Sequence, residues 1–176
     1  MQEVEQVLDL SGMTVLDLPD SGLKEMDPRR IEDVVRHHLK ELVPDVVVTY
    51  PVHGISGFHD HLVTHAVVKR VFVEMRETGI GPRRLAFFTL TEEQAARNAE
   101  VHLNGSTADE IDCICRVDES DIQTGQSALD CYRTYQQTIR RTGIRDLLDP
   151  ELHFELFDEA HHPPLDDLFD SLPSID

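Results

Sequence analysis

The chain has 176 residues and a mass of 20.0 kDa, and 40% of its residues are hydrophobic, which is enough for one ordinary core. Acidic side chains outnumber basic ones by 34 to 16, which gives a formal net charge of −18. This charge would repel a phosphate backbone or an anionic membrane surface, so we expect no nucleic-acid partner and no membrane partner.

The N-terminal part of the chain predicts two helices that are separated by a short strand and a turn. Residues 4–10 have the pattern of the end of a helix, and residues 13–18 form a β-rich run. This run stops at residues 19–22, which are typical turn residues. A second helix is predicted over residues 27–43, where a proline opens the first turn and apolar residues recur at helical spacing.

The clearest strand of the sequence is the apolar run over residues 45–50, which lies between a helix and a turn. Such a run is typical of a strand that is buried on both faces of a parallel sheet. A glycine-containing loop follows over residues 51–57, and then a predicted helix over residues 61–77 with one apolar face. Strand, loop and helix together make half of a βαβ unit.

The second half of the chain predicts further strands and one long helix. The strand candidates are residues 83–90, 111–117 and 153–157, and the helix covers residues 121–141. The alternation of strands and helices predicts an α/β fold with a mainly parallel layered sheet. We expect one domain over residues 1–160, followed by an acidic, flexible tail over residues 161–176.

Three cysteines, Cys113, Cys115 and Cys131, make an odd number and lack the spacing of a zinc ribbon. The sequence shows neither a signal peptide nor an apolar run of membrane-spanning length, so a reducing, cytoplasmic location is predicted. On a strand, Cys113 and Cys115 would share one face, and we interpret them as small buried side chains.

The loop after residue 50 is the first place to look for a site, because ligands of open parallel sheets bind at the carboxyl ends of the strands. This loop and the start of the next helix contain His53, His59, Asp60, His61 and His65. Imidazole is a common zinc ligand, and a carboxylate beside it can orient a ligand or move a proton. His61 and His65 are four residues apart and would share a helical face, so they could bind a metal jointly.

Each of these residues also has a structural interpretation. Asp60 stands just before the predicted helix, where an aspartate caps free backbone N–H groups. His65 can be a partly buried helix histidine, and His53 an ordinary loop residue. A metal-storage or sensing protein that uses His53, His59, His61 and His65 is a further reading, and it predicts tight zinc binding that is lost in His65→Ala.

Four segments of the chain form a recognisable series. They are Leu-Asp-Leu-Pro-Asp-Ser-Gly-Leu at 16–23, Pro-Asp-Val-Val-Val-Thr at 44–49, Gly-Phe-His-Asp-His-Leu-Val-Thr-His-Ala at 57–66 and Ala-Leu-Asp-Cys-Tyr-Arg-Thr-Tyr-Gln at 128–136. In this order they resemble the PIG-L/LmbE-like family of zinc-dependent N-deacetylases. Members of that family show a leucine-proline-aspartate-glycine turn, a proline-aspartate-valine-valine strand, a His-Pro-Asp-His loop and a later helix with His-Arg-Ser-Gln. The resemblance covers residues 1–158 and implies a Rossmann-like three-layer sandwich.

The resemblance implies roles for the residues of the histidine loop. The last histidine of the family's loop motif is a zinc ligand, which is His61 here, and the aspartate before it, Asp60, is implied as a catalytic residue that supports the metal and its water. The family's first histidine stabilises the tetrahedral intermediate, but Phe58 stands in its place. His59, in the proline position, is then the candidate to replace it as a catalytic donor. Tyr132 takes the histidine position of the later motif.

One part of the family pattern does not occur in this sequence. Members begin with a strand that ends in His-Pro-Asp-Asp-Glu and supplies two further zinc ligands and the general base. The resemblance therefore implies a sandwich with its first strand missing, and a fragment of a zinc-dependent hydrolase that removes an N-acetyl group from an amino sugar or related conjugate. Since one imidazole cannot hold zinc tightly, we expect this chain alone to be inactive.

The alternative interpretation is a non-catalytic remnant or a ligand-binding domain of the same fold. In either case the partner is expected to be a small N-acetylated sugar or conjugate. A homo-oligomer or an N-terminal segment from outside the sequence would then complete the protein.

Overall fold

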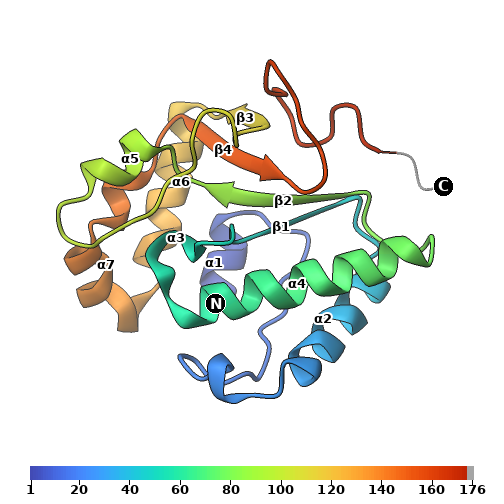
Figure 1. Cartoon of the computed structure of the whole chain (residues 1–176). Coiled ribbons are helices and arrows are strands. Elements are labelled where there is room, and N and C mark those ends of the chain that lie inside the picture. The colour runs from blue at the N-terminus through green and yellow to red at the C-terminus, as the bar shows by residue number, and fades with distance from the viewer. Residues whose placement is uncertain (174–176) are drawn as a thin grey trace.

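The computed structural model describes residues 1–173 and shows an α/β fold, as predicted (Figure 1). The strands are β1 (Val46–Thr49), β2 (Arg84–Thr89), β3 (Cys113–Arg116) and β4 (Glu151–Leu156). The α-helices are α1 (Gln2–Val7), α2 (Pro28–Leu42), α3 (Gly54–Gly57), α4 (His59–Glu77), α5 (Glu92–Arg97), α6 (Glu119–Asp130) and α7 (Gln136–Thr142). Short 3-10 helices cover Leu23–Glu25, Arg133–Tyr135 and Ile144–Leu147.

The four strands form one sheet in the order β1-β2-β4-β3. β1 and β2 are parallel, whereas β4 runs antiparallel to both of its neighbours, β2 and β3. The mainly parallel sheet that we predicted is therefore wrong for the described residues, and the Rossmann-like three-layer sandwich is not confirmed. Among the named strands of residues 1–173, only β1 and β2, which α4 connects, have the expected parallel arrangement.

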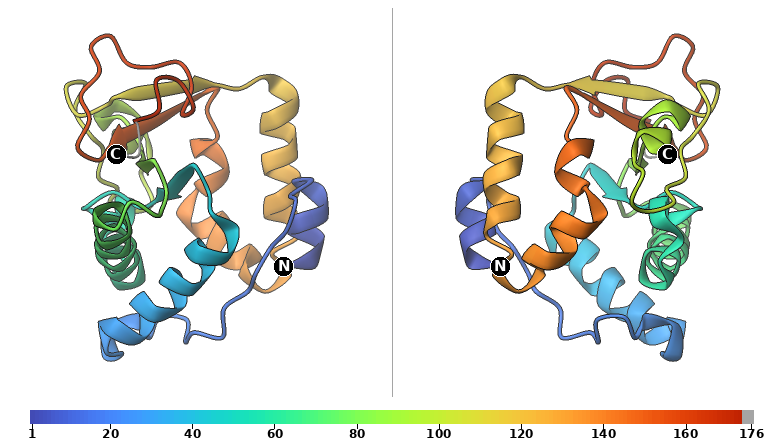
Figure 2. Two further views of the ribbon diagram at one scale, coloured as in Figure 1. Left: turned by 90° about the vertical axis from the view of Figure 1, so that its right-hand side faces the viewer. Right: turned by 90° about the vertical axis from the view of Figure 1, so that its left-hand side faces the viewer.

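The connection between β3 and β4 explains this difference. α6 leads away from the sheet, and α7 returns toward it after the turn at Arg133–Tyr135 (Figure 2). The chain thus re-enters the sheet at the end where β3 left it, which makes the two strands antiparallel. The single helix predicted over residues 121–141 would have crossed to the opposite end, but the structure breaks that helix between Asp130 and Gln136.

The strand predicted over residues 13–18 is not formed. This segment is irregular, and Val15 is 66% exposed. β1 is an edge strand that pairs with β2, and its Val48 is 50% exposed. A β-rich composition favours a strand only where a neighbouring strand receives its backbone hydrogen bonds, and among the described residues none lies beside 13–18.

The core lies on the two faces of β2. On one face, α4 packs against the strand, and Val68 and Phe72 contact Leu85 and Phe87. The same face is extended by α2, which packs along α4. On the opposite face, a cluster of buried residues from three strands contacts the C-terminal segment; it consists of Ala86, Cys113, Phe154 and Leu156, with Leu165 and Leu168 against it.

Cys113 fits the interpretation as a small buried side chain. It is fully buried, and its Sγ atom lies 3.7 Å from that of Cys115, on the same face of β3. Burial, and then the neighbouring thiol, raise the pKa of Cys113 to about 12. Since the thiolate is the reactive form, burial disfavours reaction at this cysteine.

The C-terminal segment is attached to the start of β2. Arg84 is fully buried, and its guanidinium binds both carboxylate oxygens of Glu159 at 2.9 and 2.7 Å. It also donates to the carbonyl oxygens of Leu168 and Asp170 at 2.5 and 2.8 Å. The domain boundary at residue 160 and the flexibility of the tail stay predictions, but residues up to Pro173 contact the sheet through these bonds and those of Arg83.

Candidate active site at the histidine loop

The histidine loop follows the carboxyl end of β1 and runs through α3 into the first turns of α4. His61 lies at its centre, and its imidazole stacks on the ring of Tyr50 with centroids 3.9 Å apart and planes at 9°. The ring of Phe58 meets the same imidazole edge-on at 5.5 Å. The Nδ1 atom of His61 lies 2.9 Å from the carbonyl oxygen of Gly54. Because a carbonyl only accepts hydrogen bonds, the proton is assigned to Nδ1, and Nε2 keeps a free lone pair.

His65 is held in the same way, one helical turn later. Its Nδ1 donates to the carbonyl oxygen of Tyr50 at 2.8 Å, and its ring lies 4.8 Å from that of Phe87. The side chain is buried, with 8% exposure. His65 is therefore a buried helix histidine, as its structural interpretation expected.

Asp60 does not cap the helix. The N-cap of α4 is Phe58, and Asp60 lies inside the first turn, where a carboxylate interacts favourably with the helix dipole. Its Oδ1 accepts a hydrogen bond of 3.2 Å from the backbone N–H of Leu23. His59 is the first residue of α4 and is exposed to solvent. Their assignment as catalytic residues stays a prediction.

His53 is the most unusual histidine of the loop. Its Nδ1 accepts a hydrogen bond of 3.1 Å from the N–H of Ile55, and its buried Nε2 has no hydrogen-bond partner among the described residues. Burial lowers the pKa of His53, although the carboxylates of Glu155 and Glu110 oppose this shift. The neutral ring, with its proton on Nε2, is thus the favoured form.

A hydrogen-bonded chain of three residues lies on the sheet near this histidine. Thr89 and Ser106 share a bond of 2.6 Å between their hydroxyl oxygens, and Ser106 donates to Glu155 at 2.5 Å. Asn104, two residues before Ser106, binds the loop itself through the carbonyl oxygen of Ile55. We did not predict these contacts, because residues 91–110 are a polar, mixed stretch in which only the turn-like Asn-Gly-Ser stands out.

The four segments of the family-like series are joined by direct contacts, the strand segment through Tyr50, which follows it. Asp60 joins the loop to the turn at Leu23, and the ring of His61 joins it to the end of β1 at Tyr50. The later helix reaches the turn through Tyr135, whose hydroxyl donates to Asp20 at 2.6 Å. Tyr132 is close enough to raise the pKa of Tyr50, although burial is the larger cause.

A zinc ion fits the type of donor in this loop but not the number. Within residues 1–173, no group of three or more His, Cys, Asp or Glu side chains is placed to hold a metal. A catalytic zinc ordinarily has three protein ligands and a water. The described residues therefore do not form a zinc site by themselves, and the geometry also speaks against metal storage by all four histidines.

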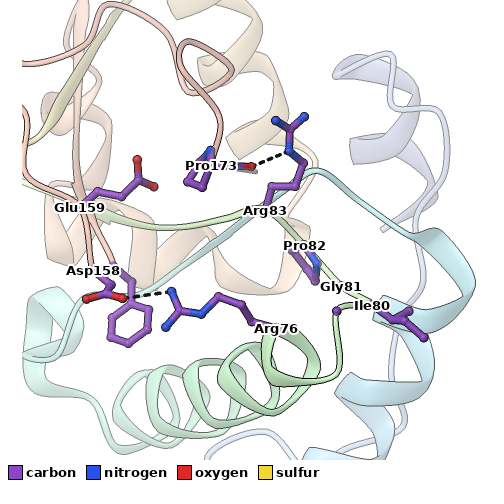
Figure 3. Close-up of a pocket in the computed structure, with 10 residues that line it drawn as sticks. Arg76, Ile80, Gly81, Pro82, Arg83, Asp158, Glu159 and Pro173 are labelled. Carbon is purple, nitrogen blue, oxygen red and sulfur yellow. Dashed lines mark hydrogen bonds and ion pairs between the residues drawn. The ribbon is translucent and has the colours of Figure 1, made fainter. Parts of the chain in front are cut away.

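The pocket drawn in Figure 3 belongs to a different part of the molecule. It has a volume of about 330 Å³ and lies at the C-terminal end of α4, whereas His61 lies at the N-terminal end. Arg76 lines it, and the 15 residues that separate it from His61 correspond to roughly 22 Å along the helix. Its arginines already have partners, since Arg76 pairs with Asp158 at 3.2 Å and Arg83 donates to the carbonyl of Pro173 at 2.9 Å.

The comparisons with known proteins agree with the sequence motifs. Residues 1–72 match the model of the PIG-L family, which is described as GlcNAc-PI de-N-acetylase. No curated protein matches the chain. In the part of the chain that the structure describes, no helix is both long and apolar enough to cross a membrane. The matched region contains the turn, the strand β1 and the histidine loop, so over these residues the chain is similar to the PIG-L family.

Proposed function

We propose that the histidine loop is one part of a hydrolase site that removes an N-acetyl group from an amino sugar or a related conjugate. The family match supports the de-N-acetylase reaction. The observation that supports the site itself is the ring of His61, which presents a free Nε2 because Nδ1–H is bound to Gly54. In this proposal His61 is one zinc ligand, and the others come from polypeptide outside these residues. We also propose a cytoplasmic location, based on the free thiols.

The neighbouring residues have separate parts in this proposal. Asp60 precedes His61 in the first turn of α4, and its carboxylate is fixed by the N–H of Leu23; in this proposal it holds or accepts a proton. His59 is exposed at the positive end of the α4 dipole, where an oxyanion is stabilised. It would supply the hydrogen bond that Phe58, at the N-cap, cannot give.

A ligand-binding domain without turnover is the second candidate. It is favoured by the lack of a three-ligand metal group among residues 1–173 and by the phenylalanine at position 58. Such a domain would bind the N-acetylated sugar but release no acetate.

The test compares the 176-residue chain with a version that is extended at its N-terminus by a strand ending in His-Pro-Asp-Asp-Glu. Both proteins are incubated with zinc and an N-acetylglucosamine conjugate, and released acetate is measured. We expect no release from the chain alone and turnover from the extended protein. In the extended protein, His61→Ala should abolish turnover, and Asp60→Asn should slow it by about 10²–10⁴-fold.

The control for His61→Ala is His37→Ala, because the side chain of His37 is 70% exposed on α2, away from the loop. Stoichiometric zinc and turnover in the chain alone would show that our view of an incomplete site is wrong. An extended protein that binds zinc and sugar but releases no acetate would support the ligand-binding candidate instead.

A further inference from the structure

The backbone around Ile55 is held on every side by hydrogen bonds from three different segments. Its N–H donates to His53 Nδ1 at 3.1 Å. Its carbonyl oxygen accepts two bonds from Asn104, one from the backbone N–H at 2.7 Å and one from Nδ2 at 2.9 Å. The preceding carbonyl, of Gly54, accepts the bond from His61.

Ile55 adopts a backbone conformation that its own side chain disfavours. Its φ of 58° and ψ of −66° interrupt the short helix α3 and are close to those of the rare, strained γ-turn. Positive φ is a genuine outlier for a β-branched residue. Such a conformation persists only where the surroundings over-determine it. Of the contacts that hold it, the pair of hydrogen bonds from Asn104 comes from farthest along the chain, 49 residues away.

Asn104 is itself fixed to the end of β2. The N–H of Ser106 donates to the carbonyl oxygen of Leu90 at 2.8 Å. Gly105, which stands between Asn104 and Ser106, lies close to the backbone of Thr91. A Cβ atom at position 105 would be 2.5 Å from the carbonyl carbon and oxygen of Thr91. The segment 104–106 therefore lies directly against the sheet, and the position of Asn104 follows from it.

The bonds form one path from the sheet to the imidazole. Asn104 fixes the carbonyl of Ile55, and the strained turn then fixes the peptide of Gly54. A Cβ on Gly54 would lie 3.0 Å from the Cβ of His61, so the two residues are in close contact. The carbonyl of Gly54 in turn decides which ring nitrogen of His61 carries the proton.

We propose that Asn104 is a positioning residue for His61: by holding the strained turn at Ile55, it keeps the proton of His61 on Nδ1 and leaves Nε2 free. The importance of a free Nε2 rests on the proposed function, in which this atom meets the metal. The positioning itself does not depend on turnover, and its test uses neither zinc nor substrate.

The test is nitrogen NMR of the ring atoms in the full chain, labelled with ¹⁵N-histidine, with His61→Gln used to assign the signals. In the wild type we expect the shifts of a protonated Nδ1 and a bare Nε2. Asn104→Asp keeps the shape of the side chain but replaces its donor by a carboxylate oxygen that repels the carbonyl of Ile55. The bare-Nε2 signal of His61 should then weaken and a protonated-Nε2 signal should appear, because the tautomer of a neutral imidazole is set by the hydrogen bond that its other nitrogen makes.

Asn98→Asp is the matched control. Asn98 is half-buried like Asn104, and its Nδ2 also donates to a backbone carbonyl, that of Thr142, at 2.7 Å. Asn98→Asp should leave the His61 signals unchanged.

If Asn104→Asp fails to fold, as judged by circular dichroism, Asn104→Ala is used, which retains the backbone bond to Ile55. A wild-type His61 that carries its proton on Nε2 would overturn the proposal, and so would a folded Asn104 variant with the wild-type tautomer. Acetate release is not measured here, so failure of the proposed reaction leaves this test unaffected.

Discussion

Buried polar groups hold the structure at both ends of β2, but with opposite effects on its stability. At its start, the guanidinium of Arg84 is fully buried and bonded to the carboxylate of Glu159 and to carbonyl oxygens of the C-terminal segment. Beyond its carboxyl end, Ile55 is held in a strained turn by neutral hydrogen bonds, one that it donates to His53 and one that it accepts from the side chain of Asn104. The first arrangement satisfies a buried charge, and the second maintains an unfavourable backbone conformation.

This contrast separates the residues that serve the fold from those that serve the site. The bonds of Arg84 attach residues 159–171 to the sheet and satisfy its buried charge. Removing one partner there can only cost stability. The turn at Ile55 lowers stability in exchange for the orientation of His61, a pattern that is common where a side chain must be pre-arranged. Relieving the strain there should therefore raise stability and loosen His61.

The largest effect is expected for Glu159→Gln, which leaves the buried charge of Arg84 without its counter-ion. We expect the free energy of unfolding to fall by about 3–5 kcal/mol, measured by urea denaturation. The control is Asp158→Asn, which removes a neighbouring ion pair with Arg76 whose carboxylate side is 66% exposed. It should cost less than about 1 kcal/mol. Equal losses in the two variants would show that the Arg84 pair is not special.

The pH dependence of the free energy of unfolding should also distinguish the two ends of β2. Burial alone would raise the pKa of Glu159, but the bonds from Arg84 and His161 outweigh it and lower the pKa below its usual value of 4.5. The stability from this pair is therefore present above pH 4.5 and is lost as the pH falls through the lower folded-state pKa.

His53 should add a separate loss at higher pH. Burial lowers its pKa below 6.5, so its contribution is present above pH 6.5 and is lost as the pH falls through the folded-state value. Urea midpoints measured across this range should show a second, more acidic decline that disappears in Glu159→Gln. If that variant keeps the whole acid profile of the wild type, Glu159 is not the group that titrates there.

The sequence predicted the local elements better than their arrangement. The sequence pattern over residues 27–77 predicts a helix opened by proline, an apolar strand and a second helix. The structure has α2, β1 and α4 in these places. The α/β class followed from the alternation of elements. The antiparallel position of β4 did not, because it depends on a break at residues 131–135 that helical periodicity does not reveal.

For the candidate site too, the sequence predicted the residues that are local to the loop but not the contacts from distant segments. The histidines and Asp60 stand close together in the sequence, so a resemblance could identify them. The bonds from Asn104 to Ile55 and from Ser106 to Glu155 each join residues that are 49 positions apart, and nothing in the local sequence reveals them. The one usable signal is Gly105, whose position against Thr91 excludes any side chain, but a lone glycine in a polar stretch reads as an ordinary turn.

The smallest change in stability is expected for Ile55→Gly. Relief of the strained conformation is worth about 1–3 kcal/mol, and the entropy of glycine costs about 0.5–1 kcal/mol. After subtraction of the lost packing of a half-buried side chain, we expect the free energy of unfolding to rise by about 1 kcal/mol or less.

The matched control is Val43→Gly. Val43 is also β-branched and has a φ of 45°, and it is 67% exposed at the end of α2. Both variants should be slightly more stable in urea, but the bare-Nε2 signal of His61 should weaken in Ile55→Gly alone. If the two variants behave alike in both measurements, the strain at Ile55 is unrelated to His61, and the contrast between the two ends of β2 does not hold.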